Sequence, residues 1–113
     1  MDRNANYYYR TTHSREAIAL VDSAVKGAGY ASLDDSPYRV WSPWEYNWAA
    51  VELMINLGVS IEWDEGCCRA LVSGQKASMA IEEPLDEDRP ACLRRAIVRA
   101  IAKVWDEKCG KST

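Results

Sequence analysis

The segment from Tyr38 to Leu57, YRVWSPWEYNWAAVELMINL, constrains the fold of this chain more than any other. It begins with the start signals of a helix: Ser42 is a favourable N-cap, Pro43 suits the first helical position, and Glu45 completes a capping box. Apolar side chains then recur at the three- and four-residue spacing that puts them on one face of a helix: Trp44, Trp48, Val51 and Ile55. The pattern therefore predicts a helix from Pro43 to Leu57 with a large apolar face to bury.

This face leads to a specific prediction about the core. Trp48 and Val51 are expected inside it, and truncating a buried tryptophan in Trp48→Ala is expected to cost about 3–5 kcal/mol. One helix cannot bury Trp44, Tyr46 and Trp48 together, since residues two apart point in different directions. Either one of these aromatic side chains is exposed, or residues 1–13 cover it.

The rest of the chain predicts a small α+β domain. Two helices and three strands are expected from the periodicity and the turn residues: a leading helix over 14–26 that Ser14 caps and Gly27 and Gly29 end, strands over 59–63, 67–73 and 77–82, and a last helix over 90–108. Short turns between the strands predict an antiparallel meander. The expected fold is this three-stranded meander packed against two main helices, both on one sheet face, with a short leading N-terminal helix.

Strand alternation predicts which side chains share a face. Val59, Ile61 and Trp63 alternate with Ser60 and Glu62 in the first strand, and the third strand is expected to use Ala77, Met79 and Ile81 as its apolar face. In the second strand, Cys67 and Arg69 point to one face and Cys68 and Ala70 to the other. The pattern leaves open which of these two pairs lies with Ser60 and Glu62 on the solvent side.

Length and composition indicate one domain. We expect a partly ordered arm over residues 1–13, the domain over 14–108 and a tail over 109–113 of the 113 residues. The net charge of −3 argues against general nucleic-acid binding. No apolar run reaches the roughly 18 residues that a bilayer span needs, and the first residues do not resemble a signal peptide. The chain is therefore expected in the cytoplasm of a host cell, away from membranes.

Cysteine and histidine usage predicts neither a metal site nor catalysis. Four cysteines are present: Cys67, Cys68, Cys92 and Cys109. Without a CxxC pair they are expected to be reduced, and no cofactor is expected. The only histidine is His13, too close to the N-terminus to serve as a positioned base. We therefore do not expect an enzyme.

Several stretches resemble the phage ABA sandwich domain, found in small phage and prophage proteins. The resemblance covers about residues 14–106 and is carried by PYRVWSPWEYNWAAVELM, by VSIEW and CCRALVSG, and by PACLRRAIVRAI, with REAIALVDSAVKGAG similar to the leading helix of that domain. The chain departs from the family pattern at RVWSPWE, which is longer and richer in tryptophan. The resemblance implies a helix–strand–helix fold and a viral origin, and it implies no catalytic residues.

Two charged surfaces remain as candidates for binding. Arg95, Arg99 and Lys103 recur every four residues on the last helix, with Arg94 beside them, as either a solvated face or a docking stripe. An acidic patch precedes that helix: Glu82, Glu83, Asp86, Glu87 and Asp88. It suits the positive end of the helix dipole, and it could also occupy a cationic groove of a partner.

The function expected from these features is non-enzymatic inhibition. The protein would bind a host protein or complex, such as one that handles nucleic acid, and block it, an anti-CRISPR or other anti-defence protein being one example. The expected contact surface combines exposed aromatic residues with a basic rim: Tyr38, Trp41, Trp44 and Tyr46 with Arg95, Arg99 and Lys103. The alternative is a self-associating phage accessory or structural protein, a homodimer for instance, which would use an exposed sheet face or edge.

Overall fold

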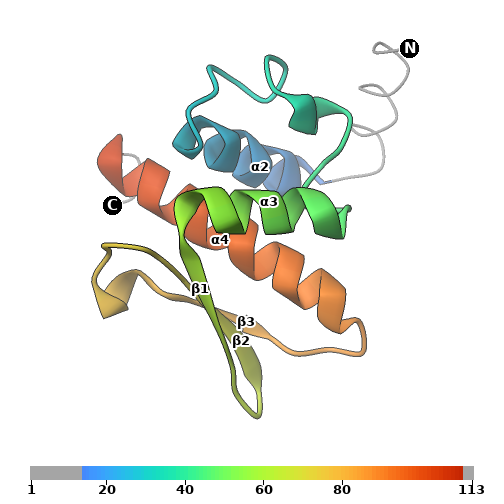
Figure 1. Ribbon diagram of the computed structural model, residues 1–113, viewed down its shortest axis with the longest axis vertical. Helices are drawn as coiled ribbons and strands as arrows, with labels where there is room; N and C mark the ends of the chain where they lie inside the picture. The colour runs from blue at the N-terminus through green and yellow to red at the C-terminus, as the bar shows by residue number, and fades with distance from the viewer. Residues whose placement is uncertain (1–13, 111–113) are drawn as a thin grey trace.

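The computed structural model describes residues 14–110 and has the expected α+β architecture (Figure 1). Its helices and strands follow in the order α2 (Arg15–Gly27), α3 (Asn47–Leu57), β1 (Val59–Trp63), β2 (Cys67–Val72), β3 (Ile81–Pro84) and α4 (Arg89–Lys108), with short 3-10 turns at Pro37–Arg39 and Ala77–Met79. The predicted N-terminal arm and the last three residues of the predicted tail lie outside the described residues. No helix in residues 14–110 is long and apolar enough to cross a bilayer.

Helix α4 is the central element of the fold. It packs against α2, against α3 and against the sheet, and Figure 1 shows it crossing the molecule between α2 and the strands. A helix covered on several sides needs apolar or small residues around most of its circumference. Its buried residues meet that need: Ala91, Cys92, Ala96, Ile97, Val98, Ala100, Ile101 and Ala102.

The leading helix is confirmed, and Gly27 explains how closely it packs. Ser14 caps α2 by accepting a hydrogen bond from the Ala17 amide at 3.1 Å. A Cβ atom on Gly27 would lie 3.0 Å from Ile101 Cγ2 of α4, so even alanine would require the Ile101 side chain to shift by a few tenths of an ångström. Glycine at this position therefore lets α2 lie directly on α4.

The sheet is an antiparallel meander in the order β1-β2-β3. Ile61 lies opposite Ala70, and Ala70 lies opposite Ile81, so these side chains share the face that packs on α4. Cys68 and Ala70 on that face are fully buried. The other face therefore carries Cys67 and Arg69, which settles the alternative that the sequence left open.

The prediction of a helix over Pro43–Leu57 is wrong for the first turn. Ser42 caps an isolated turn instead, since its hydroxyl accepts from the Trp44 amide and its carbonyl accepts from the Tyr46 amide at 2.8 Å. The Trp44 carbonyl, which a continuous helix would give to the amide of residue 48, accepts a hydrogen bond from Arg94 Nε at 3.0 Å. This contact from α4 favours a break at Tyr46, and α3 begins at Asn47.

The third strand also differs from the prediction of residues 77–82. Residues Ala77–Met79 form a 3-10 turn, closed by the hydrogen bond from the Met79 amide to the Lys76 carbonyl at 2.8 Å. The strand itself runs over Ile81–Pro84. Apolar residues at alternate positions predict a strand face there, but Ala77 is exposed and pairs with no strand in residues 14–110.

Two weakly acidic side chains, the Cys68 thiol and the Tyr38 hydroxyl, are buried. Their burial predicts how the free energy of unfolding depends on pH in the alkaline range. Burial raises the pKa of the Cys68 thiol to about 11, from an ordinary value near 9. Burial, and then the hydrogen bond to Glu52, raises the pKa of the Tyr38 hydroxyl. Because the folded state favours the neutral forms, the contribution of Cys68 is complete below about pH 9 and is lost as the pH rises through 11, whereas the contribution of Tyr38 begins to be lost only above the ordinary tyrosine pKa near 10.

We therefore expect the free energy of unfolding, measured by urea titration, to fall as the pH rises from 9 to 11. The Cys68→Ala variant should show a shallower fall, because it lacks the buried thiol. Equal slopes for the two proteins would contradict the assignment of this loss to Cys68.

Within residues 14–110 all four cysteines are free, and no group of His, Cys, Asp and Glu is arranged to hold a metal.

Candidate partner-binding site

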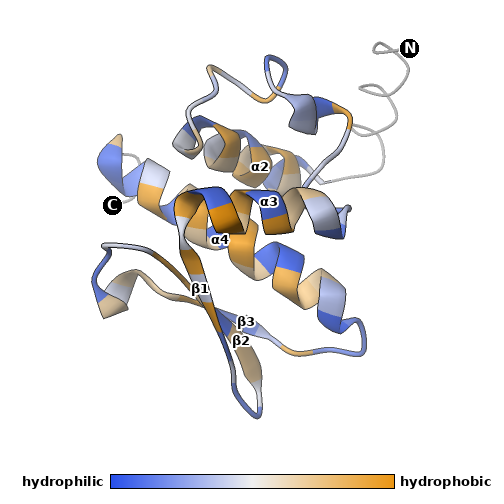
Figure 2. Cartoon of the chain, viewed as in Figure 1, coloured by the Kyte–Doolittle hydropathy of each residue, from blue (hydrophilic) through white to orange (hydrophobic). Residues whose placement is uncertain are grey.

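The apolar stripe predicted for α3 exists, but it faces outward. Trp48 is 50 % exposed and Ile55 is 68 % exposed, whereas Ala49, Ala50 and Leu53 are buried. The prediction that Trp48 belongs to the core is therefore wrong, and Val51 is only partly buried. Figure 2 shows hydrophobic and hydrophilic positions along α3, with α4 passing behind the helix.

The predicted stripe faces outward because α3 is apolar around most of its circumference. Small residues on one side, Ala49 and Ala50, let the helix approach α4 closely. The larger side chains Trp48, Val51 and Ile55 remain on the other side. Periodicity alone identifies both faces and does not decide which of them is buried.

Three exposed aromatic side chains form a cluster at the start of α3. The ring of Trp41 lies 5.4 Å from that of Tyr46 in an edge-to-face arrangement and 6.1 Å from that of Trp48. Trp41 is 46 % exposed and Tyr46 is 36 % exposed. The rings hold one another in place, so they present a preorganised apolar surface.

Two of the aromatic residues expected at a partner surface, Tyr38 and Trp44, make contacts within the fold. Tyr38 is only 1 % exposed, its ring packs edge-on against Tyr30, and its hydroxyl donates to the Glu52 carboxylate. It is a core residue and is not available to a partner. Trp44 is partly buried, and the Arg99 guanidinium lies 5.5 Å from its ring centroid.

A groove continues the exposed face of α3 towards α4. It has a volume of about 530 Å³ and is lined by Asn47 and Val51 of α3, Trp63 of β1, and Arg89, Pro90 and Leu93 of α4. Trp63 is 46 % exposed and forms one wall. We call the cluster, the outward face of α3 and this groove together the α3 surface, made of Trp41, Tyr46, Asn47, Trp48, Val51, Ile55, Trp63, Arg89, Pro90 and Leu93.

The basic stripe is not an open docking band. Arg95 Nε lies 2.8 Å from a Glu83 carboxylate oxygen, Arg95 also reaches Asp86 at 3.0 Å, and Arg99 Nε lies 3.1 Å from Glu83. Lys103 donates to the Ser78 carbonyl at 3.1 Å. These side chains therefore have partners within the same chain, in β3, in the loop after it and in the turn at Ala77–Met79, and the electrostatic rim made of Arg95, Arg99 and Lys103 stays a prediction.

The acidic patch is likewise used within the fold. Glu82 pairs with Arg69, Glu83 is buried against Arg95, and Asp88 caps α4 by accepting from the Ala91 amide at 3.1 Å. The Asp88 amide, and then Cys92 and Arg95, lower the pKa of Asp86. Glu87 is the one exposed member of the patch without a described bond or ion pair. Within residues 14–110, most carboxylates of this patch therefore have partners inside the fold, and its use by a partner stays a prediction.

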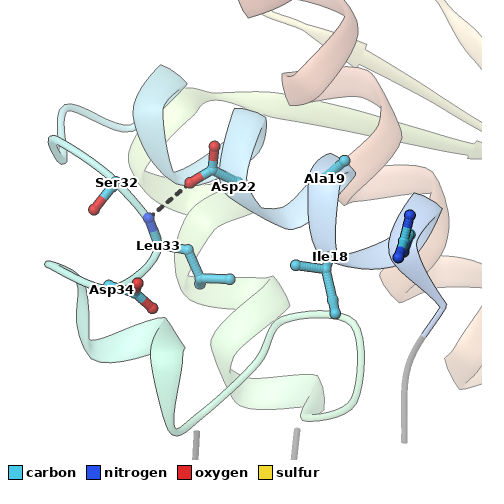
Figure 3. Close-up of a pocket in the computed structure, with 7 residues that line it drawn as sticks. Ile18, Ala19, Asp22, Ser32, Leu33 and Asp34 are labelled. Atoms are coloured by element: carbon cyan, nitrogen blue, oxygen red, sulfur yellow. Dashed lines mark hydrogen bonds between the residues drawn. The ribbon is translucent and has the colours of Figure 1, made fainter. Parts of the chain in front are cut away.

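A second hollow, of about 320 Å³, lies between α2 and the loop that follows it (Figure 3). Ile18 and Leu33 line it, and Asp22 accepts a hydrogen bond from the Leu33 amide at 2.9 Å. Asp22 also pairs with Lys26 at 2.9 Å. These contacts fasten the loop to α2, which gives this hollow a structural explanation.

Comparison with protein-family models, with curated proteins and with solved structures found no match for the chain. The resemblance to the phage ABA sandwich domain stays a prediction.

Sequence reasoning missed the groove. Trp63, Arg89, Pro90 and Leu93 are far from Val51 in the chain and meet it only in the folded structure. One signal was present: Trp63 ends the first strand beside the polar turn Asp64-Glu65-Gly66, where burying a tryptophan is difficult.

Proposed function

We propose that this protein is a binding protein, not an enzyme, and that it holds another protein on the α3 surface. The observation that carries this proposal is the outward apolar face of α3, with Trp48 50 % and Ile55 68 % exposed. Trp41 contacts Tyr46 and Trp48, and Ile55 and Trp63 are also exposed large apolar side chains; exposed apolar patches on soluble proteins often mark interaction sites. Tryptophan and tyrosine are also the residues that most often dominate binding energy at interfaces.

Replacing Trp48 with alanine tests this proposal. Because the side chain is half exposed, we expect the free energy of unfolding to change by less than about 1 kcal/mol. Affinity for a partner should fall at least about tenfold, as expected for the loss of an aromatic anchor. The partner is captured from lysate with the wild-type protein, identified, and titrated against both proteins by calorimetry.

The matched control is Tyr30→Ala, which removes an aromatic residue of similar exposure, 37 %, outside the α3 surface. Its affinity for the partner should match that of the wild type. If Trp48→Ala and the double variant Trp48→Ala/Ile55→Asp both bind normally, another surface is responsible.

A finer form of the proposal is inhibition of a host complex. The resemblance to the phage ABA sandwich domain favours it, and so does a binding surface on a small chain for which no catalytic set is expected. The partner's own activity should then fall when the α3 surface is occupied. An unchanged activity of a saturated partner would leave binding without inhibition.

Self-association is the second candidate function. The observation in its favour is the outer sheet face, where Glu62, Arg69 and Leu71 remain at least partly accessible, with β1 as an edge strand. Charged residues at an edge usually oppose pairing between copies, which makes this the weaker candidate. A solution mass of two chains by sedimentation, lost on changing Leu71 and kept on changing Trp48, would favour it over partner binding.

A further inference from the structure

We propose that the segment held on the α3 surface is an acidic amphipathic helix, which puts apolar side chains into the groove and a carboxylate beside Arg89. This inference depends on the proposed function, because it specifies the partner of the same surface. It follows from the walls of the groove, the apolar side chains in it and the charges at its rim.

The walls favour a helix over an added strand. Two of the three sides of the groove are the helices α3 and α4, whose backbone groups beyond the first turn are bonded within each helix. A partner strand could pair with the free edge of β1, but it would find most backbone groups of α3 and α4 already bonded, so recognition along the two helices must use side chains. Apolar side chains spaced at three and four residues along a helix fit a groove of this kind.

The interior of the groove is apolar. Val51 and Leu93 are partly buried in it, and Trp63 and Pro90 border it. Its volume of about 530 Å³ is enough for a small number of large apolar side chains. Trp48 and Ile55 lie on the same face of α3 as Val51, so an occupying helix would also contact them along its length.

Among the residues that line the groove, Arg89 is the one charged side chain, and Arg94 lies beside the groove through its bond to Asn47. Arg94 donates to the Asn47 side-chain oxygen at 2.6 Å and to the Trp44 carbonyl. Neither guanidinium has an ion pair with a carboxylate anywhere in residues 14–110. Arg69, Arg95 and Arg99, by contrast, each have one.

The outer sheet face shows the contrast between an arginine that is paired with carboxylates and one that is not. Its hollow, of about 620 Å³, contains Arg69 between Glu62 and Glu82, so its positive charge is already neutralised. At the α3 surface the positive charge is left for a partner to neutralise. A carboxylate there would gain an opposite charge beside an apolar contact, which favours acidic over basic helices.

The experiment uses a display library of random peptides of about 16 residues, long enough for four helical turns. The full-length protein selects binders, and the selected peptides are synthesised and titrated by calorimetry. We expect apolar residues at helical spacing, an excess of Asp and Glu, and a gain of helical circular dichroism on binding.

Three variants locate and characterise the site. Val51→Glu should abolish binding of the selected peptides, since it places a charge in the groove. Arg89→Glu should weaken binding about tenfold, because an attraction becomes a repulsion at an exposed position. Lys76→Glu, in the turn at the end of the sheet opposite to Trp63, should change affinity less than twofold. Glutamate suits the first turn of a helix, so Arg89→Glu should fold, which a thermal melt checks.

The outcomes separate this inference from the proposed function. Suppose that the selected peptides are neutral or basic, and that Trp48→Ala weakens their binding but Arg89→Glu does not. This result would overturn the acidic helix and would support the α3 surface as the binding site. Peptides that bind Trp48→Ala and Val51→Glu as well as wild type would overturn both proposals. A selection that enriches no peptide would overturn the acidic helix, while the captured partner still tests the surface.

Discussion

Replacing Ile97 with alanine is expected to lower the free energy of unfolding by about 3–5 kcal/mol, the largest effect that we predict. Ile97 is fully buried in the core, on the helix that packs against α2, α3 and the sheet. Truncation removes apolar contacts and leaves a cavity that a helix held on several sides cannot collapse to fill.

Ile55→Ala is the matched control, because it removes the same atoms from a side chain that is 68 % exposed. Its unfolding free energy should change by less than about 1 kcal/mol. Urea titrations of the two variants measure the difference. Similar losses in both would contradict the orientation of α3, and with it the outward face that carries the proposed function.

Replacing Glu83 with glutamine is expected to cost about 2–3 kcal/mol. Glu83 is only 9 % exposed and binds both Arg95 and Arg99, so its removal leaves two partly buried guanidinium groups without their shared carboxylate. Breaking a buried ion pair costs more than the pair contributes, since the remaining charge stays desolvated. The arginine side chains are 23 % and 32 % exposed, which places the cost below that of a fully buried pair.

Glu82→Gln is the control for this prediction. Glu82 is the neighbouring residue on the opposite face of β3 and pairs with Arg69 in solvent, so its loss should cost no more than about 1 kcal/mol. Thermal or urea unfolding of the two single variants compares them directly. A larger cost for Glu82→Gln than for Glu83→Gln would mean that the inner and outer faces of β3 are assigned the wrong way round.

Local signals predicted most of the elements. Ser14 marks the start of α2 as predicted, and Gly58, in the left-handed conformation with φ of 67°, follows Leu57, where the predicted helix ends. Alternation of apolar residues predicted β1 and β2, and the short turn between them predicted their antiparallel pairing. These signals depend on residues close together in the chain.

The candidate site was predicted only in part. Trp41 and Tyr46 are exposed as expected, but Tyr38 is buried, and the basic rim at Arg95 and Arg99 is occupied by Glu83. The sequence presented the basic stripe and the acidic patch as alternative surfaces for a partner. Their mutual pairing depends on how β3 lies along α4, which neither segment encodes alone.

The sequence by itself therefore determined the α+β class, the order of the elements, and which residues share a face of each helix or strand. The tertiary structure decided which faces are buried. For α3 this decision came from α4: Ala49 and Ala50 permit close packing on one side, and Arg94 takes the Trp44 carbonyl at the helix start. Periodicity defines a face through neighbours three and four residues apart, whereas burial is set by contacts between residues far apart in the chain.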